Sequence, residues 1–302
     1  MAGTRTAAQN RLLGIGLRIA ATTCFGFMAA MIKLGHEAGI ALPELAFYRF
    51  AFGLPPLLAW IVLTGNFGAW RTDRPGAHLF RGVLGLTNLV LGFSALAFLP
   101  LAEATTLSFV APLFAVMLSA LVLGEKVGRY RWSAVAIGLL GVAIVMQPSG
   151  NSLPLVGLVL GLSAALGVAS VTIAIRELGR TESTPTMVLW FSGFSTLLTG
   201  ALMPFFAEAH DLAEWSILAA LGLAGGLGQL FMTSSLRYAP VAVVVPFDYV
   251  QLLWAVLLGW LIWNSHPQAT SWAGAIIIVG SGLFTFWREH RLGRDRPRPE
   301  PL

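Results

Sequence analysis

Long apolar runs follow one another along almost the whole chain, separated by short stretches rich in glycine, proline and charge. A helix needs about 20 mainly apolar residues to cross the roughly 30 Å of hydrocarbon in a bilayer. The pattern therefore predicts an all-α integral membrane protein with ten transmembrane helices, over residues 12–34, 43–64, 77–99, 101–123, 132–148, 154–175, 185–207, 214–237, 240–262 and 271–287.

One short stretch occurs twice, at the end of the third and of the eighth predicted span. Residues 94–102 read S-A-L-A-F-L-P-L-A, and residues 234–242 read S-S-L-R-Y-A-P-V-A. Proline lacks an N–H and clashes one turn back, so Pro100 and Pro240 each predict a tight corner between two spans. A duplicated corner predicts a duplicated fold.

The two expected repeats are residues 12–148 and 154–287, with five helices each. Because five is odd, the second repeat enters the membrane from the opposite face. The Pro100 corner is then expected outside and the Pro240 corner inside. Such inverted repeats build a central cavity near the bilayer midplane and let two pseudo-symmetric states interconvert.

Lysine and arginine predict the orientation. With a cytoplasmic N-terminus, 17 of the 19 basic residues fall on the inner side, and only Lys33 and Arg49 lie toward the outside, within spans. Cytoplasmic loops carry such an excess of basic residues. We expect both termini in the cytoplasm, in a bacterial-type inner membrane, with 1–11 as an N-terminal segment and 288–302 as a disordered tail.

Composition excludes several other classes of protein. The chain is 56% hydrophobic and 11% charged, which is typical of membrane proteins. Its basic residues flank apolar runs, so they indicate membrane orientation rather than nucleic-acid binding. The single cysteine, Cys24, excludes an internal disulfide and a cysteine-based metal cluster. The expected partners are a small-molecule substrate and the lipid bilayer, without a cofactor or metal.

Signatures of enzymes and ATPases are absent from the sequence. It contains no Gly-x-x-x-x-Gly-Lys-[Ser/Thr] loop and no Gly-x-Ser-x-Gly elbow. Its histidines lie near loops and share no helical face, at positions 36, 78, 210, 266 and 290. We therefore expect a secondary transporter rather than an enzyme. A channel or scaffold is the alternative.

Polar side chains within spans are candidates for substrate binding, because they are costly in lipid. Thr87 and Asn88 lie in the third span, and Gln229 and Thr233 lie at a comparable depth in the eighth. An amide offers donors and an acceptor, which suits the head group of an amino acid. The alternative is a hydrogen bond that only joins two helices.

Four further candidates lie in other spans. Thr22 and Ser170 belong to small, polar helical faces that would form a cavity wall or a packing seam. Trp190 and Tyr249 lie deep in their spans and would supply apolar lining.

The deepest acid is Asp248. Eight residues from the inner corner, at about 1.5 Å each, place it about 12 Å into the membrane. It would carry a proton, bind a substrate ammonium group or form half of an ion pair. Nearer the outer surface we expect Arg49 and Glu103 to pair, with carboxylate recognition by Arg49 as the alternative.

Four prolines are candidate hinges. Pro100 and Pro240 form the corners, and Pro112 and Pro246 interrupt the spans that follow them. A proline frees a carbonyl and kinks a helix, as in the discontinuous helices of transporters.

The two corners, the Pro112-Leu-Phe run ending in Leu123-Gly124-Glu125, and Gly138 and Gly141 in the fifth span together resemble the drug/metabolite transporter superfamily, specifically its EamA-type ten-helix exporters. The resemblance covers about residues 12–287. It implies two inverted five-helix bundles around a central cavity that work by alternating access. It also implies export of small metabolites from the cytoplasm.

The nearest branch is that of exporters of amino acids, of broad range and including aromatic ones. Cationic drugs and nucleotide sugars are the alternative substrates. In the second half Asn264-Ser265-His266 stands where the first half has Gly124-Glu125-Lys126, which weakens a symmetric role for Glu125.

Overall fold

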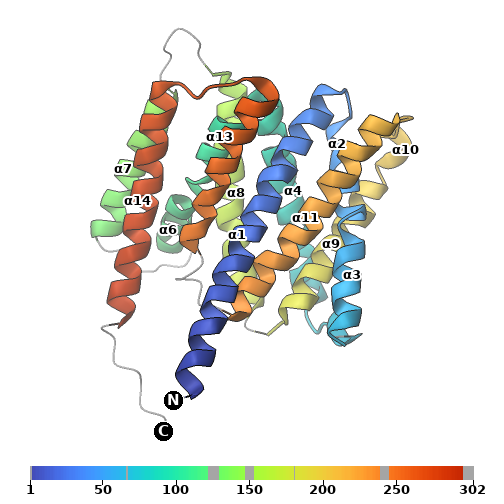
Figure 1. Cartoon of the computed structure of the whole chain (residues 1–302), viewed down its shortest axis with the longest axis horizontal. Helices are drawn as coiled ribbons and strands as arrows, with labels where there is room; N and C mark the ends of the chain where they lie inside the picture. The colour runs from blue at the N-terminus through green and yellow to red at the C-terminus, as the bar shows by residue number, and fades with distance from the viewer. Residues whose placement is uncertain are drawn as a thin grey trace.

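The computed structural model describes residues 2–65, 67–121, 129–146, 153–179, 181–238 and 245–294. Within these ranges the regular structure is helical and no strand occurs, which confirms the predicted all-α class. The elements (Figure 1) are α1 (Ala2–Glu37), α2 (Leu42–Ala51), α3 (Leu54–Leu63), η1 (Phe67–Trp70), α4 (Pro75–Phe98), α5 (Leu101–Ser108), α6 (Ala111–Leu121), α7 (Arg129–Met146), α8 (Leu155–Leu178), α9 (Thr184–Gly200), α10 (Met203–Phe206), α11 (Leu212–Tyr238), η2 (Val245–Tyr249), α13 (Val250–Trp263) and α14 (Ala269–Arg294).

The apolar helices differ in length. Five described segments are long and apolar enough to cross a bilayer: Leu12–Glu37, Leu42–Leu63, Pro75–Phe98, Leu155–Ile175 and Leu212–Ser235. Shorter apolar helices cover Leu101–Ala115, Val135–Ile144, Phe247–Trp263 and Ala269–Ser281. The total of ten spans stays a prediction.

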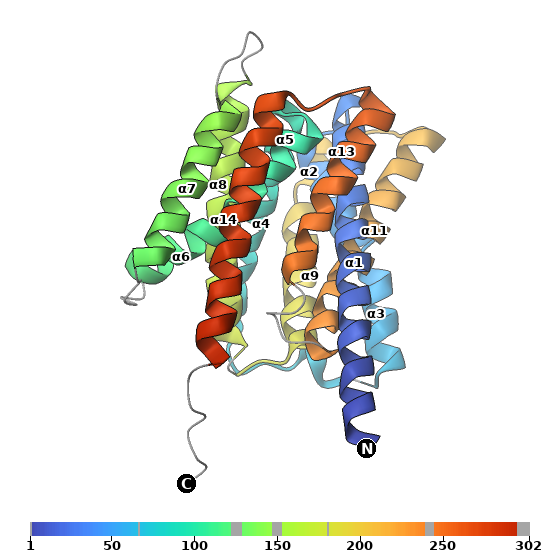
Figure 2. The same cartoon turned by 60° about the vertical axis from the view of Figure 1, so that its left-hand side comes forward.

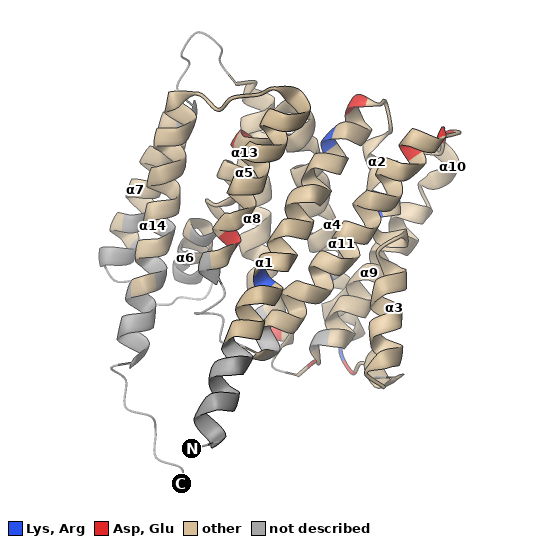
Figure 3. Ribbon diagram, viewed as in Figure 1, with Lys and Arg blue, Asp and Glu red and all other residues tan. Residues whose placement is uncertain are grey.

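The helices form one upright bundle, in which α1 begins and α14 ends at the same end (Figures 1 and 2). We call this the terminal end of the bundle and the opposite one the far end. Acidic and basic residues of the described chain lie mostly toward the two ends, and the ribbon between them carries few (Figure 3). This distribution is the one that a membrane-spanning bundle requires, because charge is costly in hydrocarbon.

The long helices pack in pairs. Helix α1 packs along α11, α4 along α8, and α7 along α14. Helices α1 and α4 correspond to the first and third spans of the predicted first repeat, and α8 and α11 to those of the second. Each first helix thus packs against the third helix of the other half. The inverted relation of the two halves remains a prediction. It would require reciprocal packing of this kind, in which α1 lies along α11 and α8 lies along α4.

Two of the predicted spans are broken near their middle. Residues 43–64 form α2 and α3 with a turn at Phe52 and Gly53, and residues 101–121 form α5 and α6 with a turn at residues 109–110. At the first break the backbone lies directly against α11. A Cβ atom on Gly226 would be 2.6 Å from the carbonyl oxygen of Gly53, so only glycine allows this approach.

The prolines lie at helix boundaries. Helix α4 ends at Phe98, Leu99 is extended, and Pro100 (φ −58°, ψ 153°) precedes α5, which confirms the first corner. Pro112 is the second residue of α6, directly after the break, and Pro246 lies in the 3₁₀ segment η2. Pro240 lies outside the described residues, as does the Leu123-Gly124-Glu125 motif.

Two predicted boundaries are wrong. The span over 185–207 ends at Gly200, and residues 203–206 form the separate helix α10. The tail predicted as disordered from residue 288 is helical as far as Arg294. The first proline of the tail is Pro297, so nothing in the sequence stops the helix earlier.

Candidate functional site

A small cavity lies where α2, α3, α9 and α11 meet. Its volume is about 10 Å³, which is room for about one water molecule. It is mostly apolar, and its polar lining comes from Arg49, Ser192 and Gln229. The remaining lining residues are Phe50, Gly53, Leu57, Val188, Gly226 and Leu230.

Arg49 is the charged group of this cavity. It is 6% exposed, and its Nε has no hydrogen-bond partner among the described residues. The guanidinium lies over the ring of Phe50, 4.3 Å from the ring centroid. Gly225 of α11 makes room for it, because a Cβ there would lie 3.3 Å from the Cγ of Arg49.

The predicted pair between Arg49 and Glu103 is wrong. Glu103 is buried on α5, and its Oε1 accepts a hydrogen bond of 3.0 Å from the hydroxyl of Ser271 on α14. Glu103 therefore joins α5 to α14, whereas Arg49 lies at the cavity between α2, α3, α9 and α11. Arg49 lines the cavity, and no carboxylate of the described chain pairs with it.

A second buried arginine lies nearby on α4. Arg81 is 5% exposed, and its guanidinium lies 4.3 Å from the ring centroid of Phe191 on α9. Phe191 in turn meets Phe50 edge to face, with centroids 5.3 Å apart and rings at 90°. Arg81 was not predicted as a site residue, because its charge was counted only among the basic residues that indicate the orientation. Its position more than a turn inside α4 was the available signal.

Asp248 forms an ion pair with Arg18 of α1. The Nε and Nη2 of Arg18 donate to the two carboxylate oxygens, so the contact is bidentate. The role of Asp248 in an ion pair is therefore confirmed, and both oxygens that would bind a substrate ammonium are occupied. Thr22 lies one turn from Arg18 and donates to the carbonyls of its own helix. Tyr249 packs on Phe109 at the α5–α6 break, with centroids 4.9 Å apart.

The other predicted side chains do not share the Arg49 cavity, apart from Gln229. Asn88 packs against Gly167 of α8, and its buried Oδ1 has no partner among the described residues. Ser170 donates to a carbonyl of its own helix at 2.9 Å. Thr233 is buried one turn beyond Gln229 but does not line the cavity. Thr87 was expected to lie with Asn88. It is exposed instead, because adjacent helical residues point 100° apart.

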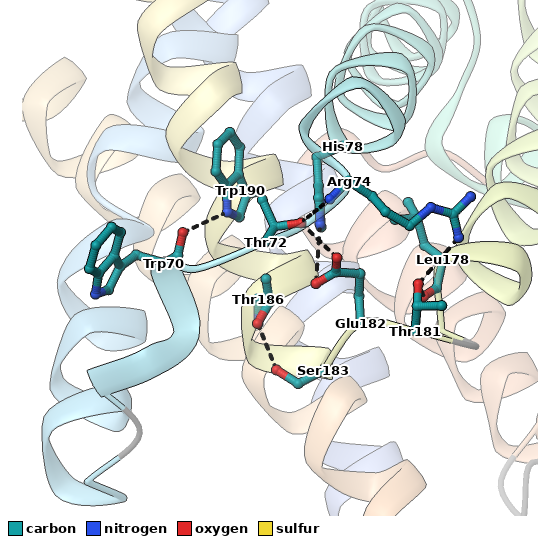
Figure 4. Close-up of polar contacts among 10 residues, drawn as sticks. All are labelled: Trp70, Thr72, Arg74, His78, Leu178, Thr181, Glu182, Ser183, Thr186 and Trp190. Carbon is teal, nitrogen blue, oxygen red and sulfur yellow. Dashed lines mark hydrogen bonds and ion pairs between the residues drawn. The ribbon is translucent and has the colours of Figure 1, made fainter.

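Trp190 does not line the cavity either, which corrects the sequence-based expectation. Its indole Nε1 donates to the carbonyl of Trp70 at 3.2 Å, and its ring stacks on His78 (Figure 4). Beside it, the hydroxyl of Thr72 donates to Oε1 of Glu182 at 2.6 Å. These contacts join the η1–α4 and α8–α9 regions at the terminal end, and we call them the terminal clasp.

At the far end, a histidine joins two acids. The Nε2 of His210 lies 2.8 Å from Oε1 of Glu44, and its Nδ1 lies 3.0 Å from Oε2 of Glu214. Burial of the ring lowers the pKa of His210, but the hydrogen bonds and charges of the two carboxylates outweigh this and raise the pKa above its ordinary value. His210 was not predicted as a site residue, because it lies near a loop in the sequence.

Apolar helices, broken spans and a buried charge in a small, mostly apolar cavity are together typical of an integral membrane transporter. The chain belongs to the EamA-like transporter family, whose model matches residues 12–147 and 155–287. The family and its named relatives are transporters of small molecules, not enzymes.

The relatives differ in what they carry. The chain is 33% identical over 269 residues to the pseudopaline exporter CntI of Pseudomonas aeruginosa, a match that covers 88% of this chain and 93% of the relative. It is 31% identical to a riboflavin transporter of Vibrio cholerae (86% and 88% covered) and 27% identical to an S-adenosylmethionine uptake transporter of Rickettsia prowazekii (82% and 84% covered).

The fold is similar to that of a solved crystal structure. The match has a TM-score of 0.65 at 20% sequence identity and covers 94% of this chain and 99% of the other. At that identity the likeness shows the fold alone.

Proposed function

We propose that the protein is a secondary transporter that exports amino-acid-type metabolites across a bacterial inner membrane by alternating access. The terminal end of the bundle would face the cytoplasm, in line with the distribution of basic residues. The observation that carries the proposal is Arg49, a buried cation that lines a mostly apolar cavity without a carboxylate partner in the described chain.

The side chains around Arg49 suit an amino-acid head group. A guanidinium binds a carboxylate through two parallel hydrogen bonds. The amide of Gln229 and the hydroxyl of Ser192 line the same cavity and offer acceptors for an ammonium group. Phe50 and Leu57 provide apolar surface for a side chain. Asp248 plays no part in this contact, because Arg18 occupies its carboxylate.

The closed cavity supports transport by conformational change. Pockets that hold small ligands are typically about 300–1,000 Å³, whereas this one holds about a single water. The helices around Arg49 would therefore separate to admit a substrate. The break at Gly53 and the segment η2 supply discontinuous backbone at which such motion would occur.

Other substrates fit the charge of the cavity less well. A cationic drug would meet the positive charge of Arg49 in a low-dielectric site, which is unfavourable. Export is favoured by the resemblance to the pseudopaline exporter, although other relatives are named for uptake. The site itself does not depend on direction.

Counterflow in proteoliposomes tests the proposal. Vesicles that contain the purified full-length protein are loaded with one unlabelled solute and assayed for exchange with labelled amino acids, nucleotide sugars and cationic drugs. We expect saturable exchange of amino acids only. Arg49→Gln should lower that exchange about tenfold or more, because it removes a charge-assisted contact. Arg71→Gln removes a charge from an exposed residue and is the matched control.

Exchange of cationic drugs in preference to amino acids would refute the proposed substrate class. Equal rates for the wild type and Arg49→Gln would refute the role of the cavity.

A further inference from the structure

Two buried arginines approach the same pair of aromatic rings. Arg49 lies over Phe50, Arg81 lies over Phe191, and both separations are 4.3 Å. The two rings touch each other edge to face at 5.3 Å. The four side chains therefore form one continuous row across α2, α9 and α4.

Neither guanidinium has its charge balanced within the described chain. The Nε of Arg49 and the Nε and Nη1 of Arg81 are buried without hydrogen-bond partners there. A cation in such surroundings carries a large desolvation penalty, which the attraction of a ring face offsets only in part. The row thus lacks negative charge, and an anionic ligand would supply it.

The acids on neighbouring elements are engaged elsewhere. Glu182 accepts from Thr72 and lies 3.6 Å from His78. Glu44 contacts His210, and Glu103 accepts from Ser271. No ion pair joins any of these acids to Arg49 or Arg81 in the described residues. The described part of the chain therefore supplies no counter-charge to the two arginines, and an anionic ligand could supply it.

We propose that Arg49 and Arg81 bind the two carboxylates of a dicarboxylate substrate, with the chain between them against Phe50 and Phe191. This deepens the proposed function and rests on it: Arg49 binds the α-carboxylate, and Arg81 selects substrates with a second one. In the closed structure the two rings fill the space between the guanidinium groups, so the substrate enters as the rings move apart.

The packing of α4 against α9 supports this arrangement. A Cβ atom on Gly85 would lie 2.7 Å from the ring of Phe191, so glycine lets the ring lie directly on α4. Arg81 is one turn before Gly85 and covers the face of the same ring. The backbone of α4 therefore positions Arg81 toward Phe191.

Acid and amide pairs of equal size provide the test. Binding of glutamate, glutamine, aspartate and asparagine to the purified full-length protein is measured by ligand-dependent thermal stabilisation and by competition in counterflow. The wild type should bind each acid about 10- to 100-fold more tightly than its amide, the range expected for one charged hydrogen-bonded contact. Arg81→Gln should abolish this preference while amide binding stays within about twofold. Arg81→Lys should retain part of it, and Arg71→Gln should keep all of it.

The outcomes separate this inference from the proposed function. Amino-acid exchange with no preference for acids in the wild type would overturn the inference and leave the proposed function intact, and this result needs no variant. Stabilisation by succinate or glutarate that depends on both arginines, without exchange of any amino acid, would support the inference and refute the amino-acid proposal. Binding of O-phosphoserine in preference to glutamate would assign the second anion as phosphate and overturn the dicarboxylate.

Discussion

The ion pair between Arg18 and Asp248 joins α1 to η2, and substitution of either residue removes it. Replacing Asp248 with asparagine keeps the size of the side chain and removes its charge, which leaves the Arg18 guanidinium without its bidentate partner. Replacing Arg18 with glutamine leaves the carboxylate alone. Both single variants are expected to be less stable than the wild type.

The burial of the Arg18–Asp248 pair determines how much unfolding free energy each single variant loses. The side chain of Arg18 is 12% exposed and that of Asp248 is 31% exposed. Exposed pairs contribute at most about 1 kcal/mol, and removing one partner of a fully buried pair costs about 3–5 kcal/mol. This pair is intermediate, so each single variant should lose about 2 kcal/mol of unfolding free energy. The double variant leaves no lone charge and should lose only about 1 kcal/mol, which implies a coupling of about 3 kcal/mol.

Equilibrium unfolding of the four proteins in mixed detergent micelles measures this cycle. A double variant that loses the sum of the two single losses would refute the reasoning, because the side chains would then act independently.

The same proteins also test proton coupling at this site by counterflow at pH 6 and pH 8. If Asp248→Asn transports with an unchanged pH dependence, Asp248 carries no proton.

Three other changes probe packing, protonation and the terminal clasp. Gly226→Ala places a methyl group against the Gly53 backbone and should lower the unfolding free energy by about 1–3 kcal/mol. Gly193→Ala is the control, because open space surrounds Gly193, and it should be near neutral. Equal unfolding free energies for the two variants would contradict the close packing at Gly226. Because the folded pKa of His210 is raised, its stabilisation is complete below the ordinary value of 6.5 and is lost as pH rises through the folded pKa. The melting temperature of the wild type should therefore fall as pH rises over this range, and that of His210→Gln should fall less. Parallel profiles for the two proteins would contradict the role of His210. Thr72→Val should cost about 1 kcal/mol by unfolding, since it removes a side-chain hydrogen bond; no loss would show that the clasp contributes no stability.

Local sequence patterns were sufficient for the class of the protein and for much of its helical framework. The apolar runs are long enough that only a bilayer accommodates them, and the proline at position 100 stops a helix in any tertiary context. The break after Ala51 was not predicted, because Pro55 and Pro56 read as part of a continuous apolar run. It depends on contact between Gly53 and the glycines of α11, which lie far away in the sequence.

The candidate site was predicted only in part, because its contacts also join residues that lie far apart in the sequence. Gln229 lines the cavity as a polar residue within a span would suggest. Asp248 was identified, but its partner lies 230 residues away in the chain and no local pattern points to it.

Arg49 was assigned to the wrong partner, and Arg81 was read as a topology signal alone. The sequence by itself determined that the chain is an apolar, helical membrane protein, because hydrophobicity is a local property of each segment. The tertiary structure decided which buried charges meet and which stay unpaired, because that depends on how segments far apart in the chain pack together.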